Sequence, residues 1–155
     1  IVGCGQIGFK TARLFKAFGA EVLASSRHEK EEWKEAGIRF ADIDILLKES
    51  DIISLHLPLN ETTKGFFDGE KIEKMKEDAI LINCARGPIV DNAALAKALN
   101  EGRIAGAAID VFDMEPPIPA DYPLLSAKNV LMTPHVAFAT KEAMVRRAKI
   151  EFDNV

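Results

Sequence analysis

The sequence has few cysteines, no basic block and no long apolar run, and each absence argues against one class of protein. Its 155 residues include two cysteines, too few for a scaffold built on disulfides, which favours a reducing, cytoplasmic setting. Lysine and arginine form no block and the formal net charge is −4, so nucleic acid is not an expected partner. No apolar run approaches the roughly 20 residues that cross a bilayer, and the first residues lack the features of a signal peptide. A membrane is therefore not an expected partner either.

What is present is typical of one globular domain. Apolar residues make up 48% of the chain and charged residues 28%, and a chain of this length can bury a full core. Only Ile1 and Val2 precede a glycine-rich segment, and two residues are the tail of a strand rather than a whole strand. We therefore expect residues 1–155 to be a single domain cut from a longer protein.

Short aliphatic runs alternate with segments of helical period along the chain. After the strand tail, runs typical of strands occupy 21–24, 52–56, 79–84, 104–109 and 130–132. Predicted helices follow the glycine-rich segment, lie at 29–36, 43–49 and 69–75, run from Asp91 to Gly102, and begin at Thr140. This alternation predicts an α/β fold, a doubly wound parallel sheet of the Rossmann type with about six or seven strands.

The first predicted helix is introduced by a glycine fingerprint, Gly3-Cys4-Gly5-Gln6-Ile7-Gly8. Gly3 permits a tight turn, Gly5 lets the backbone approach a pyrophosphate, and Gly8 lets the helix sit close to the sheet. Backbone amides at Gln6 and Ile7 and the helix dipole would hold the phosphates. Because a strand tail precedes the motif and a helix follows it, we expect NAD or NADP to bind here. One face of this helix carries Ile7, Thr11, Leu14, Phe15 and Phe18, and Gly19 ends it.

The end of the second strand bears on which dinucleotide binds. An NAD site usually has Asp or Glu about 20 residues after the glycines, where the carboxylate accepts hydrogen bonds from the ribose. This chain has Ser26 and Arg27 there instead, and these residues could hold the 2′-phosphate of NADP. Arg27 is also interpretable as a solvated loop charge in an NAD site. Both cofactors stay open, with a small preference for NADP.

Polar side chains follow the later strands. Arg86 comes after the run at 79–84, Asp110 and Glu115 after 104–109, and His135 after 130–132. In a parallel sheet these groups gather at the carboxyl edge, where open α/β folds bind ligands. Glu115 lies in a segment with four prolines and no period, which is typical of an ordered functional loop. A dinucleotide fingerprint with a cation, a carboxylate and an imidazole indicates hydride transfer to or from a small anionic substrate.

With these residues the chain resembles the cofactor domain of the D-isomer-specific 2-hydroxyacid dehydrogenases. The matching stretches occur in family order and cover nearly the whole chain: VGCGQIG at 2–8, HLPL at 56–59, LINCARG at 81–87, AIDVF at 108–112, EP at 115–116 and TPH at 133–135. Relatives include lactate, glycerate and phosphoglycerate dehydrogenases, and glyoxylate or hydroxypyruvate reductases. In them the cofactor domain is inserted within a substrate domain built from both chain ends. The resemblance therefore implies that the substrate domain is missing from this chain.

The resemblance implies a catalytic set of Arg86, Glu115 and His135. Arg86 offers a planar fork of donors that can clamp the carboxylate of a 2-keto acid and polarise its keto oxygen. His135 can donate the proton as hydride reaches the carbonyl carbon, and can accept it in the reverse direction. Glu115 would hydrogen-bond the imidazole, favour its charged form and fix its orientation. No metal belongs to the expected site.

Other positions take roles from the same resemblance. Asp110 and the backbone at Cys84 match positions that bond the nicotinamide carboxamide. His56 and Pro58 match a strand end that lines the nicotinamide ribose and adenine side of the cofactor. Phe138 stands where many relatives have glycine, and it either narrows the substrate pocket or packs in the core. The resemblance also implies a homodimer of the full-length protein.

Two further functions stay open beside this one. Transcriptional corepressors related to the family keep a similar nucleotide-sensing domain and can retain the triad, although the absence of polar low-complexity tails favours the enzyme. Formate dehydrogenases carry glutamine beside the histidine, so Glu115 argues against that activity. The expected substrate is a small 2-keto or D-2-hydroxy acid. Its side chain cannot be read here, because most of its pocket would come from the missing domain.

Overall fold

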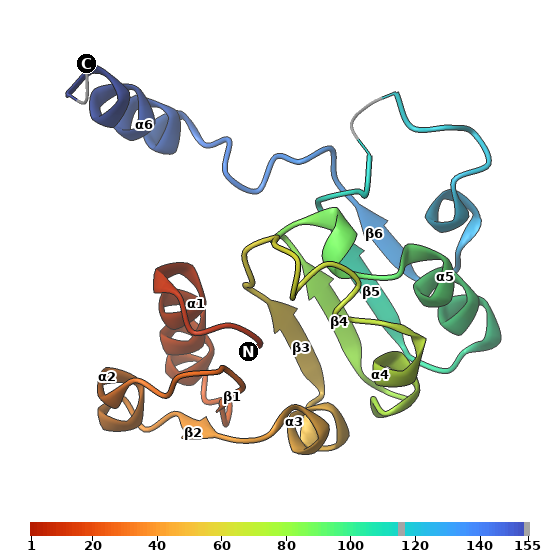
Figure 1. Ribbon diagram of the computed structural model, residues 1–155, viewed down its shortest axis with the longest axis horizontal. Coiled ribbons are helices and arrows are strands. Elements are labelled where there is room, and N and C mark those ends of the chain that lie inside the picture. Colours follow the sequence, from red (N-terminus) through yellow and green to blue (C-terminus); the bar gives the residue numbers. More distant parts are fainter. Residues whose placement is uncertain (115–116, 154–155) are drawn as a thin grey trace.

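The fold is built on six parallel strands that the first residues of the chain join together (Figure 1). The computed structural model describes residues 1–114 and 117–153. Val2 forms parallel bridges to Ser25 and to Leu55, so it lies between the two sheets. The smaller sheet pairs β1 (Leu23–Ala24) with β2 (Arg39–Phe40), and the larger sheet has the order β3 (Ile52–Leu55), β4 (Ile80–Asn83), β5 (Gly106–Ile109) and β6 (Val130–Met132).

These strands confirm the predicted fold class, and the differences are at their ends. The predicted strand at 79–84 pairs only over Ile80–Asn83, and that at 104–109 only over Gly106–Ile109. Backbone bonding continues just beyond these strands, since the amide of Ala105 donates to the carbonyl oxygen of Ala79 at 3.0 Å and the amide of Asp110 to that of Asn83 at 3.0 Å. Strand β2 was not predicted, because two residues after a glycine turn give no alternation to recognise.

The predicted helices are all present, with ends that differ by a few residues. Asp91 caps α5 as predicted, because its carboxylate accepts a hydrogen bond of 2.9 Å from the amide of Ala94. Gly102 ends that helix in the left-handed conformation, with φ of 71°. The helices are α1 (Gln6–Ala17), α2 (Glu31–Glu35), α3 (Ile43–Glu49), α4 (Gly69–Glu73), α5 (Asn92–Glu101) and α6 (Lys141–Asp153), with short 3-10 turns η1 (Gly87–Ile89) and η2 (Pro123–Ser126).

The face of helix α1 that is buried differs from the face that its apolar pattern predicts. Its buried residues are Gly8 and Ala12, whereas Leu14 is 63% exposed and Phe18 is 89% exposed. The reason is the close approach of the helix to the glycine loop, since a Cβ on Gly8 would lie 2.4 Å from the carbonyl oxygen of Gly3. Small residues therefore face the glycine loop, Leu14 and Phe18 point outward, and Phe9 and Phe15 are partly buried against the residues around Trp33.

Two hydrophobic clusters support the two sheets. The smaller cluster surrounds Trp33, which is fully buried and lies 5.2 Å from the ring of Phe9. The larger cluster lies between the four-stranded sheet and the helices packed on it, and its fully buried members include Leu46, Ile53 and Leu81. The N-terminal unit with β1 and β2 thus has its own core, and Val2 belongs to the larger one.

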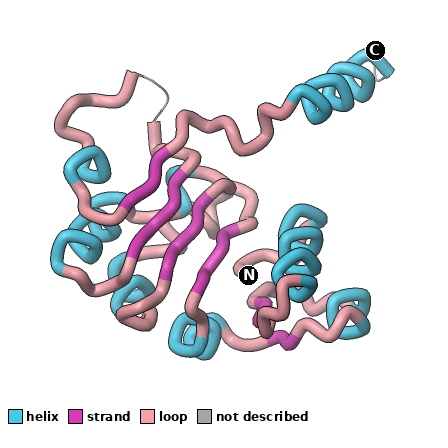
Figure 2. The backbone as a smooth tube through the Cα atoms, turned by 180° about the vertical axis from the view of Figure 1, so that it is seen from behind, coloured by secondary structure: helices cyan, strands magenta, loops and turns pink. Residues whose placement is uncertain are grey.

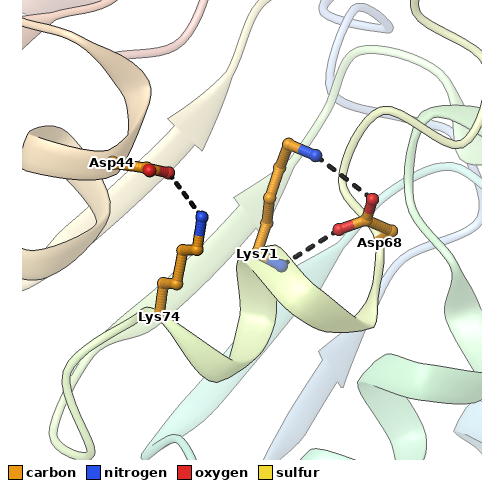
Figure 3. Close-up of polar contacts among 4 residues, drawn as sticks. All are labelled: Asp44, Asp68, Lys71 and Lys74. Atoms are coloured by element: carbon orange, nitrogen blue, oxygen red, sulfur yellow. Dashed lines mark hydrogen bonds and ion pairs between the residues drawn. The ribbon is translucent and has the colours of Figure 1, made fainter.

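Surface ion pairs connect the helices that precede β3 and β4 (Figure 3). The ammonium of Lys74, just after α4, lies 2.8 Å from the carboxylate of Asp44 in α3. Asp68 caps α4 by accepting from the amide of Lys71 at 3.0 Å and from the ammonium of the same residue at 3.2 Å. Exposed ion pairs of this kind contribute little to the free energy of unfolding. Most of the stability therefore comes from the two buried hydrophobic clusters.

Helix α6 projects away from the rest of the domain in both views (Figures 1 and 2). None of its described residues is buried. Thr140 caps it as predicted, with its hydroxyl oxygen 3.1 Å from the amide of Ala143. Within the described part of the chain, no helix combines the length and the apolar character that a membrane crossing needs.

Candidate active site

The glycine loop leads from the first strand residues into α1. Gly3 has φ of 102° and its Cα faces the backbone of His56, where a Cβ would lie 2.6 Å from the carbonyl oxygen. Both features require glycine at this position. Gly5 differs, because a Cβ there would meet nothing within 4 Å and its φ of −81° is ordinary. The fold therefore does not need glycine at Gly5, and the free space above it suits a phosphate group that approaches the backbone.

The N-terminus of α1 is available to such a group. No side chain caps this helix among the described residues, and its first turn contains no acidic residue. The amides of Gln6 and Ile7 and the positive end of the helix dipole therefore face the open space beside Gly5. These residues fit the pyrophosphate of a dinucleotide.

His56 and Pro58 follow β3, next to this loop. The Nε2 atom of His56 lies 2.9 Å from the hydroxyl of Ser54. Burial lowers the pKa of His56 to about 4. The imidazole is therefore neutral at neutral pH. Pro58 accepts a hydrogen bond of 2.6 Å from the hydroxyl of Thr63, which holds the turn after the strand.

Ser26 and Arg27 lie beyond β1 and are exposed. Ser26 is hydrogen-bonded to the thiol of Cys4 inside the glycine loop, and burial raises the pKa of that thiol. Nearby, Glu29 is paired with Lys34 at 2.7 Å. Neither Ser26 nor Arg27 offers a carboxylate to the ribose, and the carboxylate of Glu29 is paired with Lys34.

Arg86 lies in the loop after β4, and that loop is held from two sides. The buried side chain of Asn83 accepts a hydrogen bond from the amide of Ala85 at 3.0 Å and donates one to the carbonyl oxygen of Arg86 at 3.0 Å. Gly87 touches the loop after β5 so closely that a Cβ would lie 1.8 Å from the carbonyl carbon of Phe112. Sequence reasoning missed both supports, although an asparagine at a strand end is a recognisable turn signal.

Arg86 and His135 line one cleft at the carboxyl edge of the sheet. Its volume is about 230 Å³, and its apolar part includes Leu59, Phe112 and Met114. In this conformation the guanidinium of Arg86 is exposed and donates to the carbonyl oxygen of Ala85 at 2.6 Å. The cleft is therefore bordered by a cation and an imidazole over an apolar floor.

His135 occupies an unusual backbone position. Its φ is 54°, in the left-handed region, where a residue other than glycine is uncommon and needs support from its surroundings. The ring of Phe138 meets the imidazole edge to face, with 5.4 Å between the centroids. Phe138 is 46% exposed, so it packs on the imidazole at the surface and not in the core.

Asp110 is the buried charge behind this turn. Its carboxylate accepts hydrogen bonds from the hydroxyl of Thr133 at 2.5 Å, the amide of Val136 at 2.8 Å and the amide of Ala137 at 2.9 Å. Burial opposes its charge, but these bonds and the nearby imidazole of His135 outweigh burial and hold the pKa of Asp110 below its ordinary value. Thr133 was not singled out from the sequence.

The remaining predicted positions are distributed as follows. Cys84 follows β4 and is exposed overall, and partial desolvation of its sulfur and the charge of Asp110 raise the pKa of its thiol. Glu115 lies outside the described residues, so its pairing with His135 stays a prediction. The start of its loop is fixed at Asp113, which accepts a hydrogen bond of 2.7 Å from the hydroxyl of buried Tyr122.

A larger cavity of about 360 Å³ lies at the opposite edge of the sheet. It is lined by residues such as Val22, Ile52 and Ser54. None of the predicted site residues lines it. The described residues also contain no group of three or more His, Cys, Asp or Glu side chains that could hold a metal ion. The chemistry-bearing side chains therefore gather at the smaller cleft.

Comparison with known proteins agrees with this geometry. The family model for the D-isomer-specific 2-hydroxyacid dehydrogenase NAD-binding domain matches residues 1–137 of the sequence. A glyoxylate reductase from Aeropyrum pernix is 46% identical over the whole chain, which covers 46% of that protein. A D-lactate dehydrogenase from Sporolactobacillus has a TM-score of 0.92 at 37% identity, with 98% of this chain and 49% of that one covered. A D-lactate dehydrogenase from Aquifex aeolicus, solved with NAD and lactic acid, has a TM-score of 0.88 at 34% identity, covering 99% of this chain and 51% of that one. The chain thus spans about half the length of the relatives it matches.

Proposed function

This chain belongs to the D-isomer-specific 2-hydroxyacid dehydrogenases, as a member of their NAD-binding domain family, and we propose that the full-length protein transfers a hydride between NAD(P)H and a small 2-keto acid. The product in that direction is a D-2-hydroxy acid. The observation that carries the proposal is that Arg86 and His135 line one cleft at the carboxyl edge of a parallel sheet, on the side where the glycine loop presents its amides.

The cofactor supplies or accepts the hydride, and residues of this chain bind it. Gly5 gives the pyrophosphate access to the backbone, Gly3 and Gly8 let the loop and the helix pack closely, and the amides of Gln6 and Ile7 bond the pyrophosphate. His56 and Pro58 border the ribose, Ser26 and Arg27 border the adenosine, and the backbone at Cys84 and one oxygen of Asp110 address the carboxamide. These assignments rest on the positions of the residues around the glycine loop and on the family resemblance.

The two charged groups of the cleft act on the substrate. Arg86 releases the carbonyl oxygen of Ala85 and clamps the carboxylate of the 2-keto acid, while its remaining donors polarise the keto oxygen. His135 donates a proton to that oxygen as the carbonyl carbon is reduced, and recovers it in the reverse direction. Glu115 orients the imidazole in this scheme. The apolar side chains of Leu59 and Met114 exclude water from one wall of the cleft.

The proposal includes features that residues 1–155 do not contain. A substrate domain closes the other half of the cleft and selects the side chain of the 2-keto acid. The full-length protein forms a homodimer in the cytoplasm. It needs no nucleic acid, membrane or metal ion for turnover.

The test is a substrate screen on the full-length protein. Glyoxylate, hydroxypyruvate and pyruvate are offered with NADH and with NADPH, D- and L-lactate are offered with the oxidised cofactors, and formate serves as the contrasting substrate. We expect turnover of at least one 2-keto acid and, in the reverse direction, of the D isomer only. Tight binding of NADH without turnover of any substrate would instead identify a nucleotide-sensing protein, and oxidation of formate would identify a formate dehydrogenase.

A further inference from the structure

The turn that carries His135 begins on the sheet and then leaves it. The amide of Thr133 donates to the carbonyl oxygen of Ile109 at 3.0 Å, which is the last bond of the β5–β6 ladder. The amide of His135 donates back to the carbonyl oxygen of Thr133 at 3.0 Å, and His135 itself is left-handed and exposed. The backbone that follows His135 therefore forms no strand hydrogen bonds with β5. Its position depends on side-chain contacts.

Those contacts converge on a single buried carboxylate. Asp110 is 3% exposed, and its three donors come from both sides of His135 in the sequence. Oδ1 accepts from the hydroxyl of Thr133 and the amide of Val136, and Oδ2 accepts from the amide of Ala137. Asp110 thus ties the residue two before the histidine to the two residues after it. Hydrogen bonds to an ionised group are the strong class, so this clamp can hold a backbone conformation that is otherwise unfavourable.

We propose that Thr133 is a positioning residue for His135, because its hydroxyl orients the Asp110 carboxylate that holds the left-handed turn. Among the described residues, Thr133 supplies the one side-chain donor of the clamp, and the other two donors are backbone amides of the turn itself. Without that hydroxyl, Oδ1 keeps only the amide of Val136 and the carboxylate can rotate. The imidazole would then sample orientations that do not face the substrate oxygen. The catalytic consequence rests on the proposed function.

The experiment compares three single variants of the full-length protein. Thr133→Val keeps the shape of the side chain and removes the hydroxyl, whereas Thr133→Ser keeps the hydroxyl. Thr140→Val is the matched control, because its hydroxyl lies in the same segment but accepts from Ala143 and does not touch Asp110. The measurements are kcat, the KM values for 2-keto acid and cofactor, and the isotope effect with reduced cofactor deuterated at the transferred position.

We expect Thr133→Val to lower kcat roughly ten- to a hundredfold, the size of one hydrogen bond to a charged group. The KM for cofactor should stay within about twofold, and the isotope effect should rise because hydride transfer becomes slower than product release. Thr133→Ser should recover most of kcat, and Thr140→Val should behave as the wild type. A variant that merely unfolds more easily would lower the active fraction without a change in the isotope effect.

Amide hydrogen exchange gives a readout that does not depend on activity. In Thr133→Val the amides of Val136 and Ala137 should exchange at least about tenfold faster than in the wild type, while Thr133→Ser should protect them. This measurement tests the clamp even if the wild type reduces no 2-keto acid, a result that would overturn the proposed function alone. Wild-type exchange rates with wild-type kcat in Thr133→Val would overturn the positioning role. A large rise in the KM for cofactor at unchanged kcat would also overturn it, because the hydroxyl of Thr133 would then serve the contact between Asp110 and the carboxamide and not the orientation of His135.

Discussion

The two ends of the candidate site, of which only the end with Arg86 and His135 lines the cleft, are held in very different ways. At the substrate end, Arg86 and His135 stand on loops that buried contacts connect to the sheet, through Asn83, Gly87 and Asp110. At the adenosine end, Ser26 and Arg27 lie in an exposed segment, and the nearest ion pair joins Glu29 to Lys34 at the surface. General acid–base chemistry needs an accurately placed imidazole, whereas discrimination between NAD and NADP needs only the right charge nearby.

The difference implies that substitutions at the two ends will have effects of different size and kind. Near Arg86 and His135, a change disturbs buried groups and costs activity or stability. Near Ser26 and Arg27, a change is screened by water and salt and shifts a preference without damage to the fold. The following expectations test this contrast in the full-length protein, in order of decreasing effect.

The largest effect should come from the imidazole itself. His135→Gln should lower kcat by roughly two to four orders of magnitude, because a glutamine cannot exchange a proton with the substrate oxygen. The dissociation constant for NADH, measured by fluorescence, should change little. Unchanged turnover in this variant would remove His135 from the chemistry.

The next effect concerns the contact between the loops after β4 and β5. Gly87→Ala should destabilise the protein by about 1–3 kcal/mol or more, since its Cβ overlaps the backbone of Phe112 and forces the loops apart. Chemical denaturation measures this change, and kcat should fall with it because Arg86 moves. Gly69→Ala is the control: its Cβ would make an ordinary contact of 3.5 Å with Ala94 in a helix, so stability should be equal or greater. Equal losses in both variants would show that the contact at Gly87 is not special.

Asp110 should make stability depend on pH. Its folded pKa is lowered, so the charged carboxylate stabilises the fold above the ordinary aspartate pKa, and this contribution is lost as the pH falls through the folded pKa. Asp110→Asn should therefore be less stable than the wild type near neutral pH, by about 1–3 kcal/mol. The gap should shrink below about pH 4. Urea unfolding at several pH values measures it, and a gap that is constant with pH would contradict a charged Asp110.

The smallest effect should be at the adenosine end. We expect the unaltered protein to use NADPH at least as well as NADH, because Ser26 offers no carboxylate to repel a 2′-phosphate and Arg27 can bond it. Ser26→Asp should shift the ratio of kcat/KM values toward NADH by roughly tenfold, with no change in stability. A strong preference for NADH before the substitution would show that these residues do not read the phosphate.

The sequence predicted the order of elements well, for reasons that are local. The helix at 43–49 was predicted from its period, and the helix after Asp91 from its apolar period and capping residues, which act within a few positions of the chain. The parallel pairing followed from the repeated alternation, which predicted one sheet of about six or seven strands; the structure has six strands, divided into a sheet of four and a sheet of two. Strand β2 and the outward face of α1 were not predicted, because a two-residue strand has no period and the packing of α1 depends on its distance from the glycine loop.

In the candidate site, too, some features were predictable from the sequence and others depended on packing. Its chemistry was determined by the sequence, since the glycine fingerprint and the residues after each strand specify which groups are present and at which edge of a parallel sheet they lie. Only the tertiary structure decided how those groups are held. Thr133 and Gly87 act through contacts with Asp110 and Phe112, which are 23 and 25 positions away in the chain. Such contacts leave no periodic signal, because they depend on the distance between two loops after the strands have paired.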